Sequence, residues 1–423
     1  MRWVRSFVSS DVLVGEPRDV VLIEAVLAAS KLSIPFLTLY LVQTRGVDYA
    51  TAGLFVAVRG LGGLVAVMLA GAIADRFGEK PVVLTLLGGA ALSAAAIPHL
   101  DSLTSLMVGF FLLGAFVNAV QPVFSALVVR TIPVRQWTEV YAAEYWALNV
   151  GFAFTALVGG RVAVLAFDWV FHLEAVGTLL AFVLVARILP STRPRSRAAA
   201  TPEADCGLLG RARDALAAVS LAARDRLAVA LISSTLLFAM CLSQMTGTLP
   251  LDMEASGYSP DLYGYVIFWN GALLMLFQLR AGRAIARRRG MRILARAAAV
   301  AALGYGMLAF LHQHLALILL CLTVWTVGEM MDAPVRNAVV SALAKPGSRA
   351  RYLGLVSAAL TVGYCVGPWL GGWVLQVAGR EVLWLGTAAG ALLCGLIRLA
   401  ITPRVERRTG RSLQAPSAPT GRP

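Results

Sequence analysis

The stretch GAIADRFGEK, residues 71–80, is a short polar segment between two long apolar runs. Gly71 and Gly78 allow sharp turns of the backbone, because a residue without a Cβ tolerates conformations that other residues avoid. The residues that can form ion pairs at a membrane surface are Asp75, Arg76 and Lys80. The stretch is therefore expected to be a tight loop between two buried helices.

The composition of the 423-residue chain is that of a membrane protein. Hydrophobic residues make up 58% of it and charged residues only 14%, whereas soluble domains carry about a quarter charged residues. The apolar residues fall in runs of about twenty, the length that a helix needs to cross the hydrocarbon core of a bilayer. A water-soluble globular domain is thereby excluded.

Twelve such runs predict an all-α polytopic membrane protein. They cover residues 20–42, 50–72, 81–98, 103–129, 140–165, 168–188, 228–250, 260–280, 291–312, 314–340, 352–378 and 382–402. A linker at 189–227, rich in Pro, Ser and Arg, divides them six and six. Two six-helix bundles are therefore expected at 20–188 and 228–402. Residues 1–19 are expected to be a cytoplasmic N-terminus and residues 403–423 a disordered cytoplasmic tail.

The positive charges predict the orientation of the chain. Lys and Arg number 37 against 23 Asp and Glu. Most of them are assigned to the N-terminus, the even-numbered loops and the tail, and the other loops hold only Arg45, Arg161 and Arg380. Cytoplasmic loops carry such an excess, so both termini are expected in the cytoplasm and the chain in the cell inner (plasma) membrane. The basic balance then reflects topology, and no nucleic-acid partner is expected.

The two halves of the chain repeat. At an offset of 212 residues, GFAFTALVGG (151–160) aligns with GYCVGPWLGG (363–372), and Pro122 aligns with Pro334. Six spans per half give both halves the same orientation, which predicts a parallel repeat about an axis along the membrane normal. Two such bundles can rock about their interface and expose a central site to one side of the membrane at a time.

The stretch at 71–80 fits the pattern G-x-x-x-D-R-x-G-x-K/R at every fixed position. In a short loop between spans 2 and 3, it resembles the signature of the major facilitator superfamily, and the spans, the repeat and the long central loop extend this resemblance over the whole chain. The resemblance implies a transporter in which Asp75 latches the two bundles near the positive N-terminus of span 11. The related stretch at 283–292 has Arg287 in place of the acid, which predicts a weaker or different latch.

The span 11 stretch GYCVGPWLGG fits G-x-x-x-G-P-x-x-G-G. This pattern resembles the antiporter motif of drug:proton antiporters in the superfamily, where it belongs to span 5. Here span 5 has Thr155 and Ala156 at the Gly-Pro positions. Small residues four apart also let helices approach closely in lipid, so a role in packing alone fits equally. The fixed positions of the motif are Gly363, Gly367, Pro368, Gly371 and Gly372.

Span 4 departs from the pattern of many proton-coupled relatives. Where these carry an arginine four residues before a glycine, this chain has Phe110 and Gly114. The family's usual proton relay is therefore not expected.

Polar and ionisable residues within spans are candidate functional residues, because a charge at the bilayer centre costs at least about 2.5–3.5 kcal/mol. The family resemblance implies that spans 1, 4, 7 and 10 line a central cavity. The candidates for the substrate and proton cavity are Glu24, Lys31, Arg59, Asn118, Gln121, Glu144, Asn149, Glu329, Asp332 and Arg336.

The carboxylates among these residues suggest two roles. Glu24 and Glu329 are the candidate proton carriers, because a carboxylate in an apolar cavity can hold a proton near neutral pH; solvation near the cytoplasmic end is the alternative for Glu24. Asp332 and Arg336 stand four residues apart with the acid first, which favours an ion pair within the helix. Arg59 is expected to pair with an acid of another helix that the sequence does not identify.

Together these features predict a secondary transporter and no enzyme. It is expected to export small organic or drug-like compounds by alternating access in exchange for protons, as a monomer without cofactor or metal. An uptake carrier or uniporter for a small metabolite is the main alternative. A membrane-embedded enzyme would need acids or histidines clustered at one interface, and a non-transporting sensor on the same fold is the remaining alternative.

Overall fold

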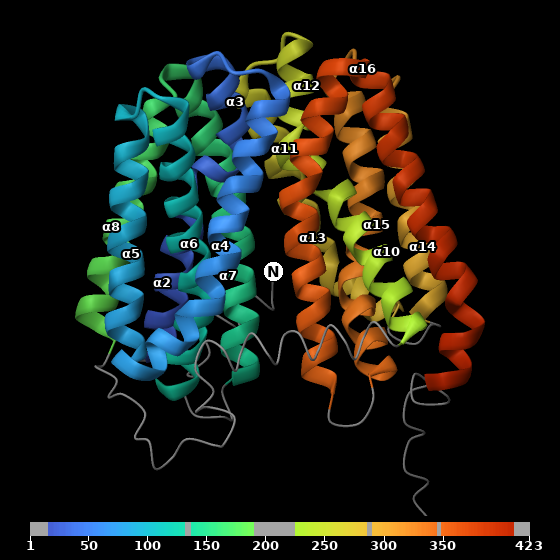
Figure 1. Ribbon diagram of the computed structural model, residues 1–423, viewed down its shortest axis with the longest axis horizontal. Coiled ribbons are helices and arrows are strands. Elements are labelled where there is room, and N and C mark those ends of the chain that lie inside the picture. Colours follow the sequence, from blue (N-terminus) through green and yellow to red (C-terminus); the bar gives the residue numbers. More distant parts are fainter. Residues whose placement is uncertain (1–15, 132–136, 190–224, 286–289, 345–347, 410–423) are drawn as a thin grey trace, which may run out of the picture. The chain divides into compact units, whose positions relative to one another are not determined.

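The structure is a computed structural model that describes residues 16–131, 137–189, 225–285, 290–344 and 348–409. Every regular element in these residues is helical (Figure 1). The elements are α2 (Glu16–Ser30), α3 (Ser33–Arg45), α4 (Tyr49–Phe77), α5 (Glu79–Ala96), η2 (Ile97–His99), α6 (Leu103–Thr131), α7 (Trp137–Leu165), α8 (Asp168–Ile188), α10 (Arg226–Leu242), α11 (Gln244–Gly247), α12 (Leu249–Ala255), α13 (Pro260–Ile285), α14 (Gly290–Leu308), α15 (Leu315–Leu343) and α16 (Arg349–Thr409).

Ten helical segments of the described chain are long and apolar enough to cross a membrane. α16 covers both of the last two predicted spans, and it contains Gly379 with φ 80° and ψ 179°. That left-handed backbone suits a glycine, so α16 consists of two helices that meet at a turn. α13 covers the eighth predicted span but is not among the ten segments. The all-α polytopic class is confirmed, and the count of twelve spans stays a prediction.

The described helices form two compact units. Unit 1 is drawn from residues 1–211 and 245–272, and unit 2 from residues 212–244 and 273–423. The second segment of unit 1 packs closely on its first: the Tyr263 ring meets the Phe36 ring edge-on, with centroids 5.6 Å apart. The predicted bundle boundaries assign that second segment to the C-terminal bundle, and they stay a prediction.

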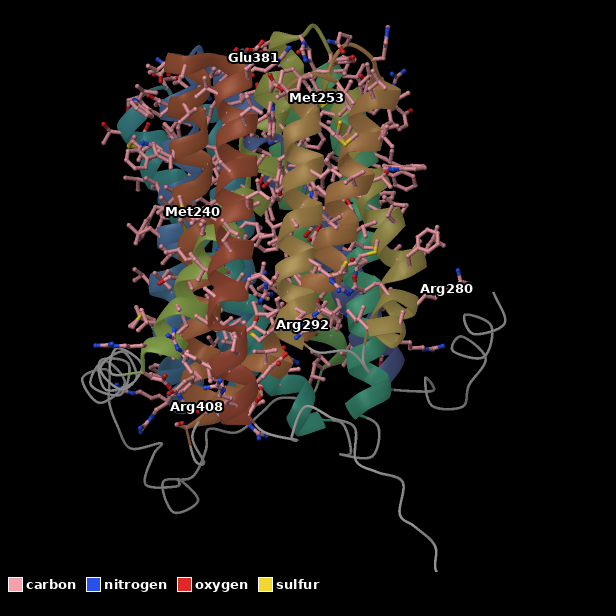
Figure 2. The ribbon with its side chains drawn as sticks, turned by 90° about the vertical axis from the view of Figure 1, so that its right-hand side faces the viewer. Met240, Met253, Arg280, Arg292, Glu381 and Arg408 are labelled. Atoms are coloured by element: carbon pink, nitrogen blue, oxygen red, sulfur yellow. The ribbon has the colours of Figure 1, made fainter. Side chains whose placement is uncertain are left out.

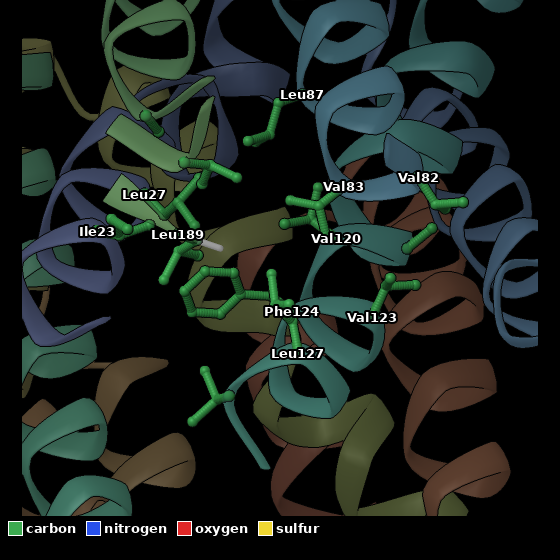
Figure 3. Close-up of a cluster of buried hydrophobic side chains, with 14 of the residues drawn as sticks. Ile23, Leu27, Val82, Val83, Leu87, Val120, Val123, Phe124, Leu127 and Leu189 are labelled. Carbon is green, nitrogen blue, oxygen red and sulfur yellow. The ribbon is translucent and has the colours of Figure 1, made fainter. Parts of the chain in front are cut away.

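Apolar side chains from α2, α5, α6 and α8 form a core of unit 1. Figure 3 shows Leu27, Val83, Leu87 and Phe124 in this cluster. Glycines bring the neighbouring helices α4 and α6 close together. A Cβ on Gly114 would lie only 2.7 Å from the carbonyl carbon of Arg59, so the span 4 glycine noted in the sequence serves helix packing.

Unit 2 has its core between α10, α14, α15 and α16. Tyr305 lies between two tryptophans, with its ring centroid 4.8 Å from that of Trp325 and 6.4 Å from that of Trp384. Figure 2 shows Arg292 and Arg408 near one end of these helices and Glu381 at the opposite end. The end with the arginines is the one predicted to be cytoplasmic.

Equivalent helices make equivalent contacts in the two halves. Gly151 of α7 leaves no room for a Cβ against Ala28 of α2, and Gly363 of α16 leaves none against Ala239 of α10. The two glycines are related by the repeat offset of 212 residues found in the sequence, and the two alanines by an offset of 211. The first helix of each half is also interrupted at corresponding positions, between α2 and α3 and between α10 and α11. Interruptions at matching positions of two repeats point to a binding region.

Candidate functional site

The first predicted span is interrupted at Lys31 and Leu32, which lie between α2 and α3 (Figure 1). The span predicted at 20–42 is present as one membrane-length segment, Asp19–Arg45, but its helix is not continuous as expected. Pro35 explains the interruption: a proline has no N–H to offer the carbonyl four residues earlier, and its ring collides with that carbonyl. The carbonyl in question belongs to Lys31, so the chain leaves the helix at this point.

Side chains of neighbouring helices bind the backbone groups that the interruption exposes. The Thr155 hydroxyl donates to the carbonyl oxygens of Ala28 and Ala29, both at 3.1 Å. The backbone N–H of Ser33 donates to Oε2 of Glu174 over 2.7 Å. Irregular backbone at membrane depth is tolerated where protein groups satisfy it, so this region of unit 1 is held in place by polar contacts.

Glu174 is an intramembrane acid that the sequence analysis missed. It stands on α8 and is 1% exposed. Its Oε1 atom has no hydrogen-bond partner within the described part of the chain. Its main electrostatic partner is Arg59 of α4, followed by Lys31. Glu174 is thus an acid of another helix that attracts Arg59, and an ion pair between the two stays a prediction.

Glu24 is fully buried in α2. Its Oε1 accepts a hydrogen bond from Nε2 of Gln121 at 3.0 Å, and its Oε2 has no partner among the described residues. Lys31, seven residues later, attracts it electrostatically. This burial disfavours the alternative of a solvated Glu24, and the role of Glu24 stays a prediction.

A small cavity lined by both polar and apolar side chains lies beside the interruption of span 1. Its volume, measured as the space open to the centre of a water molecule, is about 20 Å³, which is enough for one water. Polar residues from three helices and the interruption line it: Ser30, Lys31, Gln121, Glu174 and Thr178. We call Glu24, Lys31, Arg59, Gln121 and Glu174 the unit 1 cluster; its two acids and two bases give a formal charge of zero when all four are ionised.

Unit 2 contains a second group of buried charges. Arg336 pairs with Asp332 one turn earlier in α15, as the spacing predicts. Nη1 of Arg398 lies 2.7 Å from Oδ1 of Asp332, and its guanidinium carbon lies 5.0 Å from the centroid of the Phe238 ring. We call Asp332, Arg336 and Arg398 the unit 2 cluster.

Arg398 corrects the charge count made from the sequence. It falls within the last predicted span, 382–402, but was counted with the basic residues of the C-terminus, and it is fully buried in α16. It also donates to the carbonyl oxygen of Leu294 at 2.9 Å. A single arginine in an apolar run is the signal that could have identified it. Its acid partner could not be read from the sequence, because it lies on another helix.

The remaining cavity candidates belong to neither the unit 1 cluster nor the unit 2 cluster. Asn118 is exposed but packs closely on Gly63, where an added Cβ would lie 2.8 Å from its Cγ. Asn149 and Glu329 are half-buried, and Glu329 has an electrostatic interaction with Tyr364. The side chain of Glu144 lies outside the described residues. Their expected roles in a cavity stay predictions.

The loop at 71–80, which carries the signature pattern, contacts the C-terminal end of α8. Gly78, with φ 90° and ψ 152°, separates α4 from α5. Nζ of Lys80 donates to the carbonyl oxygens of Ala186 at 2.9 Å and Leu189 at 2.5 Å, where a cation stabilises the end of α8. Asp75 is half-buried. Its latch to span 11 concerns two separate units and stays a prediction, and Arg287 lies outside the described residues.

The span 11 motif packs against α10. A Cβ on Gly367 would lie 2.8 Å from the carbonyl oxygen of Met240. The Gln244 side chain donates to the Gly367 carbonyl oxygen at 2.9 Å. Pro368 stands inside α16, and Gly371 lines a 230 Å³ cavity together with side chains of α10. The motif thus holds span 11 against the interrupted span 7, and a role in export stays a prediction.

Comparisons with known proteins agree with this architecture. The sequence profile described as Major Facilitator Superfamily matches residues 25–331 and 253–422. An uncharacterized MFS-type transporter, YqjV, of Bacillus subtilis (strain 168) is 25% identical over 387 residues, which cover 89% of this chain and 90% of the relative.

Two further relatives have names that state an activity. A Na(+), Li(+), K(+)/H(+) antiporter of Planococcus maritimus is 22% identical and covers 89% of this chain and 92% of its own length. The multidrug resistance protein MdtH of Salmonella typhimurium (strain LT2) is 25% identical, with 83% of this chain and 85% of the relative covered.

A solved structure shares the fold. The nucleoside transporter NupG superposes with a TM-score of 0.77 at 14% identity, covering 91% of this chain and 98% of its own. At this identity the similarity shows the fold alone. With the family profile matching nearly the whole chain of membrane-length helices, the protein belongs to the Major Facilitator Superfamily, and it is a transporter and not an enzyme.

Proposed function

We propose that this transporter exports small organic, drug-like compounds in exchange for protons. The observation that carries the proposal is Glu24, a buried carboxylate with one oxygen held by Gln121 and the other without a partner in the described chain. Such a group can bind a proton on the second oxygen and release it again. The multidrug resistance relative supports export of such compounds, and the cation/proton antiporter relative supports exchange for protons.

Export of the compound and entry of the proton would be coupled because both bring positive charge to the unit 1 cluster. With all groups ionised the cluster is formally neutral, and a bound proton makes it positive. A positive cluster repels a cationic compound, because like charges in a low-dielectric interior interact strongly. A cationic compound and a proton would therefore exclude each other, as antiport requires.

The buried charges of unit 2 fit a different role. Asp332 lies against two arginines, one on α15 and one on α16. We assign the unit 2 cluster to holding α15 and α16 together.

Ethidium accumulation in inside-out membrane vesicles tests the proposal. With an acidic lumen, vesicles containing the wild-type protein are expected to accumulate ethidium, and Glu24→Gln is expected to abolish accumulation that depends on the pH gradient. Glu381→Gln, which changes an exposed acid, is the control. If Glu24→Gln and Glu329→Gln both transport ethidium against its gradient like the wild type, the proposal is wrong. Uptake of a metabolite in right-side-out vesicles would instead favour an uptake carrier.

A further inference from the structure

We propose that Glu174 is a second proton-binding carboxylate of this transporter, which lines a water-sized cavity together with Lys31 at the interruption of span 1. The inference rests on the proposed function for its role in coupling, and it adds a proton site on a helix other than that of Glu24. The proton adds to one carboxylate oxygen to give a neutral carboxylic acid, and it leaves as a proton to water.

The geometry of Glu174 leaves one oxygen available for a proton. Its Oε2 accepts from the N–H of Ser33 at 2.7 Å, at the start of α3, where the helix dipole favours an acceptor. Its Oε1 is buried and has no hydrogen-bond partner within the described part of the chain. A proton can therefore bind at Oε1 without breaking the bond that orients the side chain.

Gln121 lies between the cavity that Glu174 lines and Glu24. Gln121 lines the cavity and also donates to Oε1 of Glu24 at 3.0 Å. The cavity has room for one water, and the hydroxyls of Ser30 and Thr178 lie on its wall. Water and hydroxyl groups pass protons along hydrogen bonds, so the cavity offers Glu174 a place to which it can release a proton.

Two cations act on Glu174 from the elements packed around it. Arg59 approaches from α4, and Lys31 lies in the interruption between α2 and α3. Lys31 also attracts Glu24. When Glu174 is protonated it no longer attracts the Lys31 ammonium, which can then pair fully with Glu24. The proton state of Glu174 thereby sets how strongly Glu24 is neutralised.

Infrared spectroscopy of the purified protein in liposomes tests the site without any transported compound. A protonated carboxylic acid has a carbonyl stretch distinct from that of a carboxylate. The wild-type protein is expected to show this band at neutral pH and to lose it reversibly in alkali. Glu174→Gln should remove a resolved part of the band, and Glu381→Gln, an exposed control, should leave it unchanged.

A second variant keeps the test decisive if Glu174→Gln does not fold. Lys31→Met removes the ammonium that favours the ionised acids, so it is expected to enlarge the protonated-acid band. An unchanged band in Glu174→Gln, or in Lys31→Met where only that variant folds, would overturn the inference.

Vesicle transport of ethidium separates this inference from the proposed function. Glu174→Gln is expected to lose at least ten-fold in efflux driven by a pH gradient while keeping ethidium exchange without a gradient. Wild-type efflux rates in Glu174→Gln would refute its coupling role. If the wild-type protein itself shows no gradient-driven efflux but Glu174→Gln loses the infrared band, the proposed function fails and the proton site stands.

Discussion

In the unit 2 cluster, removal of the acid is expected to lower the stability of the protein more than removal of one of its arginines. Asp332→Asn leaves Arg336 and Arg398 buried without their shared acid, whereas Arg398→Gln leaves Asp332 paired with Arg336. The formal charge of the cluster is +1 in the wild type, +2 in Asp332→Asn and zero in Arg398→Gln, counted from its one acid and two bases. Loss of the acid should therefore be the more damaging change.

The magnitude follows from what each substitution leaves behind. Removing one partner so that buried charges lack compensation costs about 3–5 kcal/mol, which applies to Asp332→Asn. Arg398→Gln loses charged hydrogen bonds of about 1.5–3 kcal/mol but leaves a compensated pair. For a domain of roughly 150–250 residues, a difference of about 2 kcal/mol in unfolding free energy corresponds to roughly 4–8 °C in the unfolding midpoint.

Thermal unfolding in detergent, followed by tryptophan fluorescence, measures these differences. The double variant Asp332→Asn/Arg398→Gln returns the cluster to +1 and is expected to be more stable than Asp332→Asn alone. Asp101→Asn, at an exposed loop acid, is the control. The reasoning is refuted if Asp332→Asn is as stable as Arg398→Gln, or if the two losses simply add in the double variant.

Four further substitutions test the packing and the cytoplasmic end of the protein. A Cβ at Gly354 meets nothing within 4 Å, so Gly354→Ala should raise stability by up to about 1 kcal/mol through its helix propensity. Gly367→Ala places a Cβ 2.8 Å from a carbonyl oxygen of α10 and should lower stability by about 1–3 kcal/mol through overpacking. Equal unfolding midpoints of the two variants would contradict this reasoning. Burial raises the pKa of Asp225, but hydrogen bonds from Arg408 and a tyrosine outweigh it and hold that pKa below the ordinary 3.8. The stabilisation from Asp225 is then fully present above pH 3.8 and is lost as pH falls through the lowered pKa, so midpoints measured against pH should show this acid-dependent loss in the wild type and not in Asp225→Asn. Lys80→Met removes both hydrogen bonds to the end of α8 and should lower stability by roughly 1 kcal/mol; hydrogen exchange at that helix end that matches the wild type would argue against the cap.

The helical class and the family follow from the sequence because both depend on local patterns. Apolar runs of membrane length predict helices wherever they occur, and the loop at 71–80 carries its pattern in ten consecutive residues. The interruption at Lys31 also has a local signal, because Pro35 stands four residues later in an otherwise apolar span.

The pairing of buried charges could not be read in the same way. Glu174 and Arg59 stand on α8 and α4, and Arg398 and Asp332 on α16 and α15. Which face of a helix meets which neighbour depends on tertiary packing, and an almost uniformly apolar span gives little sign of its orientation. The intrahelical pair Asp332 and Arg336 could be predicted because its geometry is fixed by spacing alone.

Proton release on ethidium binding tests the central claim most directly. The purified protein is placed in a weakly buffered detergent solution with a pH indicator, and ethidium is added. The wild-type protein and Glu381→Gln are expected to release protons, and the double variant Glu24→Gln/Glu174→Gln is expected to release none. No release from the wild type, or undiminished release from the double variant, would contradict proton exchange at the unit 1 cluster.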